Sequence, residues 1–350
     1  MAVRGSLPPK VLFGIGGLVF LIMIPVISTT GFFLHMATLI LLWTMLCLSL
    51  NVIFGYGGQL SLAHGGLFGT GAYIYGVLVT KLSIDFWLAF PIAGAATGVI
   101  GLLIGIPSLR LKGPYFVIIT LGFNIILVAI IENLSSLTEG VNGLVGIPGP
   151  RGISWLFFAR DFSSKTSQYY LILFFLLGFW LVMYFIKNSR IGRCLVAIKE
   201  DEDLCQSVGM NTMWIKVQTF VLSSILAGLG GVLYASFIGI LTPHDASFHM
   251  GFDALVYLTV GGIGSIVGTI LGPAIMILIS ELLQTVVEIR LFINGLALII
   301  LIIFMPRGIV GGIAYLWEKF FRGRGKTTNG STGGKYVTGS QEFSKSIWGS

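Results

Sequence analysis

The chain has 350 residues, of which 55% are hydrophobic and only 10% are charged, and its net charge is +7 at pH 7. Soluble globular proteins carry about 25% charged residues, so this composition excludes a soluble enzyme or binding domain and indicates an integral membrane protein. The basic residues form no patch interleaved with aromatic residues, which excludes a nucleic-acid-binding protein, and the weak period-two alternation argues against a β-barrel.

Hydropathy predicts an all-α polytopic membrane protein with about ten transmembrane helices, and about eight or nine crossings are the alternative. In chain order the expected spans are 11–28, 34–53, 65–80, 87–106, 114–132, 169–187, 217–240, 253–269, 270–288 and 291–306. With both termini in the cytoplasm, most of the 21 Lys and Arg residues fall on the cytoplasmic side, as the positive-inside rule requires. Such a chain divides into two halves of about five spans with inverted topology, a recurring architecture of transporters.

Small residues recur at helical spacing in several spans. The three series are Gly94, Gly98, Gly101 and Gly105; Ala227, Gly231 and Ala235; and Gly264, Gly268 and Gly272. Small residues at this spacing let helix backbones approach closely. We therefore expect a dense bundle rather than a wide aqueous pore.

The stretch "GYGGQLSLAHGG" (55–66) follows the second expected span and belongs to a predicted cytoplasmic loop at 54–64. It places Gln59, Ser61 and His64 among closely spaced glycines. These side chains, together with Asn124 in the span 114–132, either satisfy the hydrogen bonds of a broken or re-entrant backbone or line a pathway. The structural role is the favoured alternative.

Two long segments between spans differ in character. Residues 133–168 are rich in Gly, Pro and Ser and are expected to form an external loop. Loops of this length are often functional. Residues 188–216 are expected in the cytoplasm, where alternating charge and helical spacing indicate an amphipathic helix pair. That segment either docks into a partner or is a solvated loop. Residues 1–325 thus form one transmembrane domain, and the Ser/Thr/Gly-rich residues 326–350 a disordered cytoplasmic tail.

No catalytic signature stands out. "GRGKTT" (323–328) lacks the first glycine of a phosphate-binding loop, since Phe320 occupies that position. The three cysteines match no metal-ligand spacing. Glu281 is a carboxylate within a late span, with either an ion-coupling or a packing role. We expect no enzyme activity, no bound cofactor and no metal.

Several stretches together carry a family resemblance. They are "GYGGQLSLAHGGLFGTGAY" (55–73), "GPYFVIITLGF" (113–123), "SLTEGVNGLVGIP" (136–148), "SRIGRCLVAIKEDEDLCQSVGMN" (189–211), "VLSSILAGLGGVLYA" (221–235) and "GGIGSIVGTILGP" (261–273). In this order and spacing, the chain resembles the M-type permease subunits of branched-chain amino acid ABC importers. The resemblance implies a type II importer fold.

The resemblance also implies a coupling segment that contacts a cytoplasmic ATP-binding subunit. In such permeases this segment carries a Glu–x–Ala–Ala…Gly pattern. Glu202 and Gly209 match it, whereas Leu204 and Cys205 replace the two alanines, and the basic Arg193 lies upstream. These residues are the expected ATPase-coupling set.

By the same resemblance, the chain is a translocation subunit of the bacterial or archaeal cytoplasmic membrane. It pairs with a related permease, two cytoplasmic ATPase subunits that use the ATP, and an external solute-binding protein that contacts Thr138 and Asn142. The expected substrate is a branched-chain amino acid, although relatives handle urea, short amides and other amino acids. The rival is a secondary transporter or channel that works without ATPases. A membrane-embedded enzyme is disfavoured because no convergent polar site is evident.

Overall fold

The computed structural model describes residues 31–150 and 164–282, with short helical pieces at 16–17, 19, 21–26 and 308–309. These residues all belong to one compact unit, Met1–Gly312. The expected span 291–306, half of the span 11–28, the tail 326–350 and residues 151–163 of the external loop lie outside the described residues.

The described residues are mostly helical, which confirms an α-helical polytopic membrane protein. Five helices are long and apolar enough to cross a membrane: Gly31–Tyr56, Phe86–Ser108, Pro114–Asn133, Lys165–Asn188 and Thr212–Ile238. Each contains one of the expected spans or nearly coincides with it. Their spacing in the chain follows from long apolar runs separated by short polar or glycine-rich turns.

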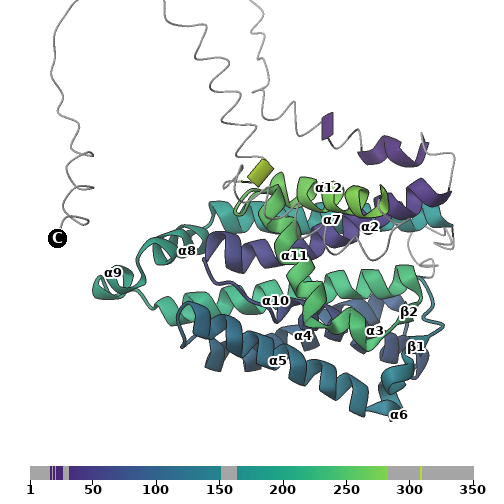
Figure 1. Ribbon diagram of the computed structural model, residues 1–350, viewed down its shortest axis with the longest axis horizontal. Helices are drawn as coiled ribbons and strands as arrows, with labels where there is room; N and C mark the ends of the chain where they lie inside the picture. The colour runs from purple at the N-terminus through teal and green to yellow at the C-terminus, as the bar shows by residue number, and fades with distance from the viewer. Residues whose placement is uncertain are drawn as a thin grey trace, which may run out of the picture. The chain divides into compact units, whose positions relative to one another are not determined.

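The elements are labelled in chain order (Figure 1). The larger helices are α2 (Gly31–Leu50), which continues as the π-helix η1 (Asn51–Tyr56), α3 (His64–Thr80), α4 (Phe86–Ser108), α5 (Pro114–Asn133), α7 (Lys165–Asn188), α8 (Arg190–Glu200), α9 (Glu202–Ser207), α10 (Thr212–Ile238), α11 (Phe248–Gly261) and α12 (Gly268–Leu282). The small elements are α6 (Ser135–Thr138), η2 (Gly140–Asn142), η3 (Pro243–Ala246), β1 (Leu144–Val145) and β2 (Ile240–Leu241).

The two ends of the bundle carry different elements. Figure 1 shows α8 and α9 at one end of α7 and α10, and α6, β1 and β2 at the opposite end. The two strands pair antiparallel, with Leu144 opposite Leu241 and Val145 opposite Ile240. The loop after α5 is thereby tied to the chain that leaves α10.

Helix α10 is the central element and packs against α3 and α4 along much of its length. Small residues make this possible. A methyl group at Gly98 would lie 2.6 Å from Ile225 of α10, and one at Gly231 would overlap the carbonyl oxygen of Phe68 in α3. The predicted close approach through small residues is confirmed for these helices.

The expected boundary between the eighth and ninth spans is wrong. The span predicted at 253–269 ends as α11 at Gly261, because Gly262 and Gly264 take positive φ angles of 118° and 79° that a helix cannot continue. The loop 262–267 therefore replaces the expected turn at 269–270. Helix α3 (His64–Thr80, 17 residues) agrees with the expected span 65–80 to within one residue.

Candidate functional site

The segment 57–63 joins the π-helix η1 to α3 and is the irregular backbone on which the candidate site is built. It follows a six-residue π-helix, a rare conformation that is common at functional sites. Gly58 has a φ of +69°. A Cβ atom at Gly57 would lie 2.6 Å from the carbonyl oxygen of Ile53. Glycine is required at both positions because one needs left-handed backbone and the other has no room for a side chain.

Helix α5 satisfies the backbone of this segment. The Thr120 hydroxyl accepts a hydrogen bond from the Leu62 amide at 3.2 Å, and Asn124 Nδ2 donates to the Leu62 carbonyl at 3.1 Å. Thr120 and Asn124 are four residues apart and share one face of α5. Both are fully buried. Within apolar surroundings an unpaired peptide group costs several kcal/mol, so these two side chains permit the broken backbone.

His64, the first residue of α3, is buried in a short hydrogen-bonded chain. Its Nε2 lies 2.6 Å from the Ser223 hydroxyl of α10, and that hydroxyl donates to the Ser49 carbonyl of α2 at 2.6 Å. Because the Ser223 proton is used on Ser49, Nε2 must be the protonated ring nitrogen. The His64 Nδ1 atom is then an acceptor, and it has no partner among the described residues. Three helices therefore meet at this hydroxyl.

The segment lies inside the bundle rather than in an open loop. At a rise of about 1.5 Å per residue, Ser223 and Asn124 lie roughly 15 Å along α10 and α5 from the starts of those helices. Ser61 is buried and accepts a hydrogen bond from the Ala63 amide at 3.3 Å. Helices α5, α10 and α11 enclose residues 61–64, the last part of the segment 54–64.

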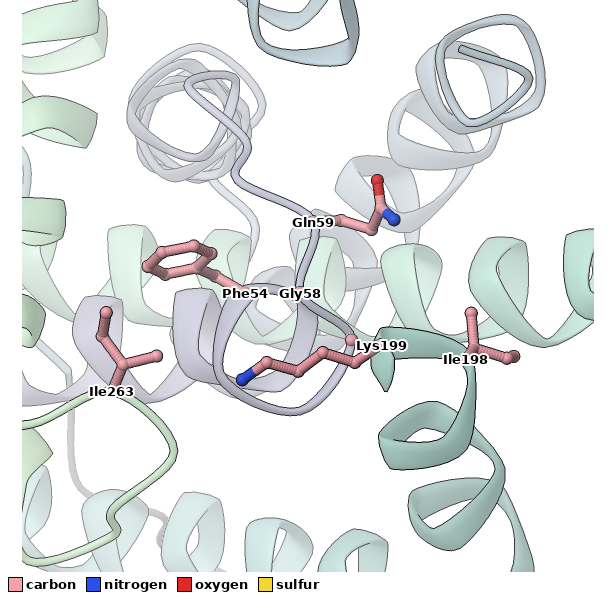
Figure 2. Close-up of a pocket in the computed structure, with 7 residues that line it drawn as sticks. Phe54, Gly58, Gln59, Ile198, Lys199 and Ile263 are labelled. Carbon is pink, nitrogen blue, oxygen red and sulfur yellow. The ribbon is translucent and has the colours of Figure 1, made fainter. Parts of the chain in front are cut away.

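Gln59 differs from the other polar residues, because it is partly exposed. It lines a cavity of about 410 Å³ at the junction of η1, α8 and the loop 262–267. The other lining residues are Phe54, Gly57, Gly58, Ile198, Lys199 and Ile263. Figure 2 shows Gly58 and Gln59 on the loop, with the Lys199 side chain of α8 running beside the turn that holds Gly58. The predicted polar set thus divides into three buried residues and one cavity residue.

Helices α8 and α9 form the segment between α7 and α10, and side chains cap both of them. The Ser189 hydroxyl accepts from the Gly192 amide at 3.1 Å, and Asp201 Oδ1 accepts from the Leu204 amide at 2.9 Å. Such caps satisfy the free amides at a helix start. The predicted amphipathic helix pair is confirmed. Arg193 is exposed on α8 and donates to the Asn188 carbonyl at 3.1 Å.

Glu202 is directed into the protein. Its carboxylate accepts from Lys216 Nζ of α10 at 2.6 Å and from the Thr212 hydroxyl at 3.1 Å. The side chains of Lys216 and Glu202 are only 3% and 14% exposed. Lys216 Nζ also lies 3.4 Å from the Leu109 carbonyl at the end of α4. This pair fixes α9 against α10 and the α4–α5 loop.

The remaining residues of the expected coupling set fall on both sides of α9. Cys205 is buried, whereas Leu204 is 62% exposed, and Gly209 is exposed with a φ of +83° that ends the turn. Val208, which follows the end of α9 at Ser207, is 72% exposed. The outer surface of α9 therefore carries the apolar Leu204 beside the exposed polar residues Asp203, Gln206 and Ser207.

A second, exposed ion pair joins α9 to the α4–α5 loop. Lys112 Nζ lies 2.6 Å from Asp203 Oδ1. The hydrogen bond that Lys112 donates to Asp203 raises the pKa of Lys112. Exposed pairs of this kind contribute little to stability, so this contact orients the loop rather than holding it.

At the opposite end of the bundle, the two residues expected to contact a binding protein differ in burial. Thr138 is buried, and its hydroxyl donates to the Ile131 carbonyl at 2.5 Å and accepts from the Gly140 amide at 3.2 Å. Asn142 is exposed on η2. Thr138 therefore shapes the loop, and Asn142 is part of its surface.

Comparison with known proteins identifies the family. A family model described as the permease component of branched-chain amino acid transport systems matches residues 32–305. The chain belongs to this family. It is 31% identical over 327 residues to the high-affinity branched-chain amino acid transport system permease protein LivM of Escherichia coli K12, covering 88% of this chain and 77% of LivM.

The chain is also similar to other permeases. It is 29% identical over 288 residues to LivH of the same organism, covering 77% of this chain and 91% of LivH. It is 25% identical over 290 residues to a probable LivM of Methanocaldococcus jannaschii, covering 72% of this chain and 82% of that protein. No solved structure matches the chain significantly. The matched range of the permease family includes every element from α3 to α12 and nearly all of α2.

Four residues that organise the site in this permease were not predicted: Thr120, Ser223, Lys199 and Lys216. Thr120 and Ser223 lie within apolar spans, where a hydroxyl usually bonds to its own helix. The spacing of Thr120 and Asn124 is the one available signal for a polar face. Lys216, next to the start of an apolar span, offers a second signal, since a buried lysine requires a partner. Among the described residues, no cluster of three His, Cys, Asp or Glu side chains is placed to hold a metal ion.

Proposed function

We propose that this chain is the membrane-spanning permease subunit of an ABC importer for branched-chain amino acids, in a bacterial or archaeal cytoplasmic membrane. The observation that carries the proposal is the family match over residues 32–305, which covers the bundle and the α8–α9 segment. Relatives named as branched-chain amino acid permeases of both the LivM and LivH types support it. Similarity to both types also supports a partner permease of related sequence.

The proposed topology has about ten spans, both termini in the cytoplasm and two inverted halves. It is supported by the five long apolar helices and by the shorter helices α3, α11 and α12 that pack among them. The transmembrane domain extends over residues 1–325. Residues 326–350 are the cytoplasmic tail.

The surface for the ATPase subunit is the outer face of α8 and α9, where Arg193, Leu204 and Gly209 are exposed. Glu202 and Cys205 act from inside, because they hold α9 in place. When the ATPases close around ATP, α8 and α9 move with them, and the bundle changes which side it opens to. Energy then enters through a docking surface, so no relay of buried charges is needed.

At the external end, we assign the contact with the solute-binding protein to the loop that carries Asn142. Exposed apolar side chains of Val141, at 78%, and Val145, at 64%, lie beside it. Thr138 contributes by keeping this loop in shape. Gln59, Ser61, His64 and Asn124 form the polar seam at which the bundle changes its opening.

The test is uptake by proteoliposomes that hold this chain, its partner permease and both ATPases, with the binding protein outside and ATP inside. We expect accumulation of labelled leucine that stops when ATP is replaced by ADP. The purified chain alone, with a proton or sodium gradient and no ATP, should accumulate none. Gradient-driven uptake by the chain alone would establish the rival class, a secondary transporter.

A further inference from the structure

The C-terminal end of the π-helix η1 is held by a residue of α8. Lys199 Nζ donates a hydrogen bond to the Gly55 carbonyl at 3.0 Å. Carbonyls in the last turn of a helix lack partners within the helix, and they carry the negative end of the helix dipole. A lysine at this position donates a hydrogen bond to a free carbonyl and places a positive charge at the negative end of the dipole. The contact is therefore favourable although the acceptor is uncharged.

We propose that Lys199 is the positioning residue that transmits movement of α8 to the π-helical end of α2. The proposal rests on the proposed function, in which α8 and α9 contact the ATPase. Lys199 is not part of the family's coupling pattern. We assign to it the step by which movement of α8, outside the bundle, reaches the helices inside the bundle.

The backbone beside Lys199 is shaped around α8. A Cβ atom at Gly58 would lie 2.8 Å from the Lys199 Cγ, and one at Gly57 would lie 3.6 Å from Leu195 Cδ2 of α8. The turn after the π-helix is therefore in direct contact with one face of α8. The cavity of about 410 Å³ adjoins the same turn, and beside it the buried Leu195 of α8 belongs to the same hydrophobic cluster as Val52 and Tyr56 of the π-helix. The Lys199 hydrogen bond adds a directional polar link between α8 and the Gly55 end of the π-helix.

The link continues through the π-helix to a third element. Asn51 Oδ1 accepts from the Gly264 amide at 2.9 Å, in the loop between α11 and α12. Gly55 faces the same loop, because a Cβ atom there would lie 3.0 Å from the Gly264 nitrogen. Asn51 is fully buried, yet its Nδ2 has no partner among the described residues. The π-helix is therefore held between α8 and the loop that follows α11.

The charge of Lys199 is not part of a buried ion pair. Within the described ranges, the ion pairs at the α8–α9 end of the bundle are Lys112–Asp203 and Lys216–Glu202. Replacing Lys199 therefore leaves no carboxylate stranded in the interior. The link can therefore be removed without unfolding α8. Replacing Glu202, by contrast, would leave the buried Lys216 without its partner and disturb the position of α9 at the same time.

The experiment uses the complete transporter in proteoliposomes and compares Lys199→Met, Lys199→Arg and the matched control Lys187→Met, which removes an exposed lysine near the end of α7. Transported leucine per ATP hydrolysed is the readout. We expect Lys199→Met to keep ATP hydrolysis while leucine per ATP falls about tenfold, Lys199→Arg to restore most of the ratio, and Lys187→Met to match wild type.

An unchanged ratio in Lys199→Met, or a ratio in Lys199→Arg as low as in Lys199→Met, would overturn the proposal. If wild type itself shows no ATP-dependent uptake, it is the proposed function that fails. Should Lys199→Met not assemble, Lys199→Gln takes its place. Amide hydrogen exchange of residues 51–58 then gives a second readout: faster exchange in the variant supports the link, and unchanged exchange refutes it.

Discussion

The Glu202–Lys216 pair offers the sharpest test of how α9 is held. The two side chains lie 2.6 Å apart and are 14% and 3% exposed. Removing one partner of a buried ion pair typically costs about 3–5 kcal/mol, because the other charge is left without compensation. Glu202 keeps only the Thr212 hydroxyl when Lys216 is lost. We therefore expect Lys216→Met to destabilise the protein by roughly 3 kcal/mol.

The double variant separates the ion pair from packing. With both charges removed, in Glu202→Gln/Lys216→Met, the stranded carboxylate disappears, so the double variant should be less destabilised than the sum of the single variants. We expect an interaction free energy of about 1–3 kcal/mol in this cycle. The measurement is thermal unfolding of the purified protein in detergent, with hydrogen exchange of residues 202–208 to localise the effect.

The matched control is Glu200→Gln, which removes an exposed carboxylate two residues before Glu202. It should unfold like wild type. Additive single variants, within about 0.3 kcal/mol, would show that the pair does not hold α9. Glu202→Lys places two ammonium groups together and should destabilise α9 itself. Its loss of transport would then report a misplaced helix as well as a lost docking contact.

Three further predictions follow from individual contacts. Ser223→Ala removes the hydroxyl that links His64 to α2, so the free energy of unfolding should fall by about 1–3 kcal/mol, measured by thermal unfolding in detergent. Gly231→Ala places a methyl group against a backbone carbonyl of α3 and should destabilise by about 1–3 kcal/mol, whereas Gly178→Ala, with open space around it, should change stability by less than about 0.5 kcal/mol. Lys112→Gln should leave the melting temperature unchanged from pH 6 to 9. The raised pKa of Lys112 means that its ion pair is fully present below the ordinary value of 10.5 and is lost only at higher pH, and an exposed pair contributes little. A melting difference that grows within that pH range would contradict this reasoning.

The helical fold was predictable because apolar run length and charge placement act locally. The five long helices agree with expected spans within a few residues. The breaks were less predictable. A glycine series can continue a packed helix, as in α4, or end one, as at Gly262 and Gly264, and the choice depends on what packs against it. Sequence periodicity carries no information on that partner.

The candidate site was predictable in composition but not in pairing. Asn124 and His64 were expected in a polar set, and both are fully buried with hydrogen bonds. Their partners, Leu62 and Ser223, are brought together by the packing of α3 against α5 and α10. Glu202 was expected from the family pattern as a contact residue, but its direction depends on Lys216, which lies fourteen residues further along the chain.

The anchors of α8 and α9 converge on one segment of the bundle. Lys199 of α8 holds the Gly55 end of the π-helix, and Lys216 and Glu202 hold α9 against the α4–α5 loop. That loop leads directly into α5, whose Thr120 and Asn124 hold Leu62. We therefore expect movement of the two small helices to reach residues 57–63 from both sides, through α2 and through α5. A rigid, continuous helix at this position would resist such movement. Glycines and a backbone supported by side chains allow it, which gives a physical reason for a polar, glycine-rich break between two apolar helices.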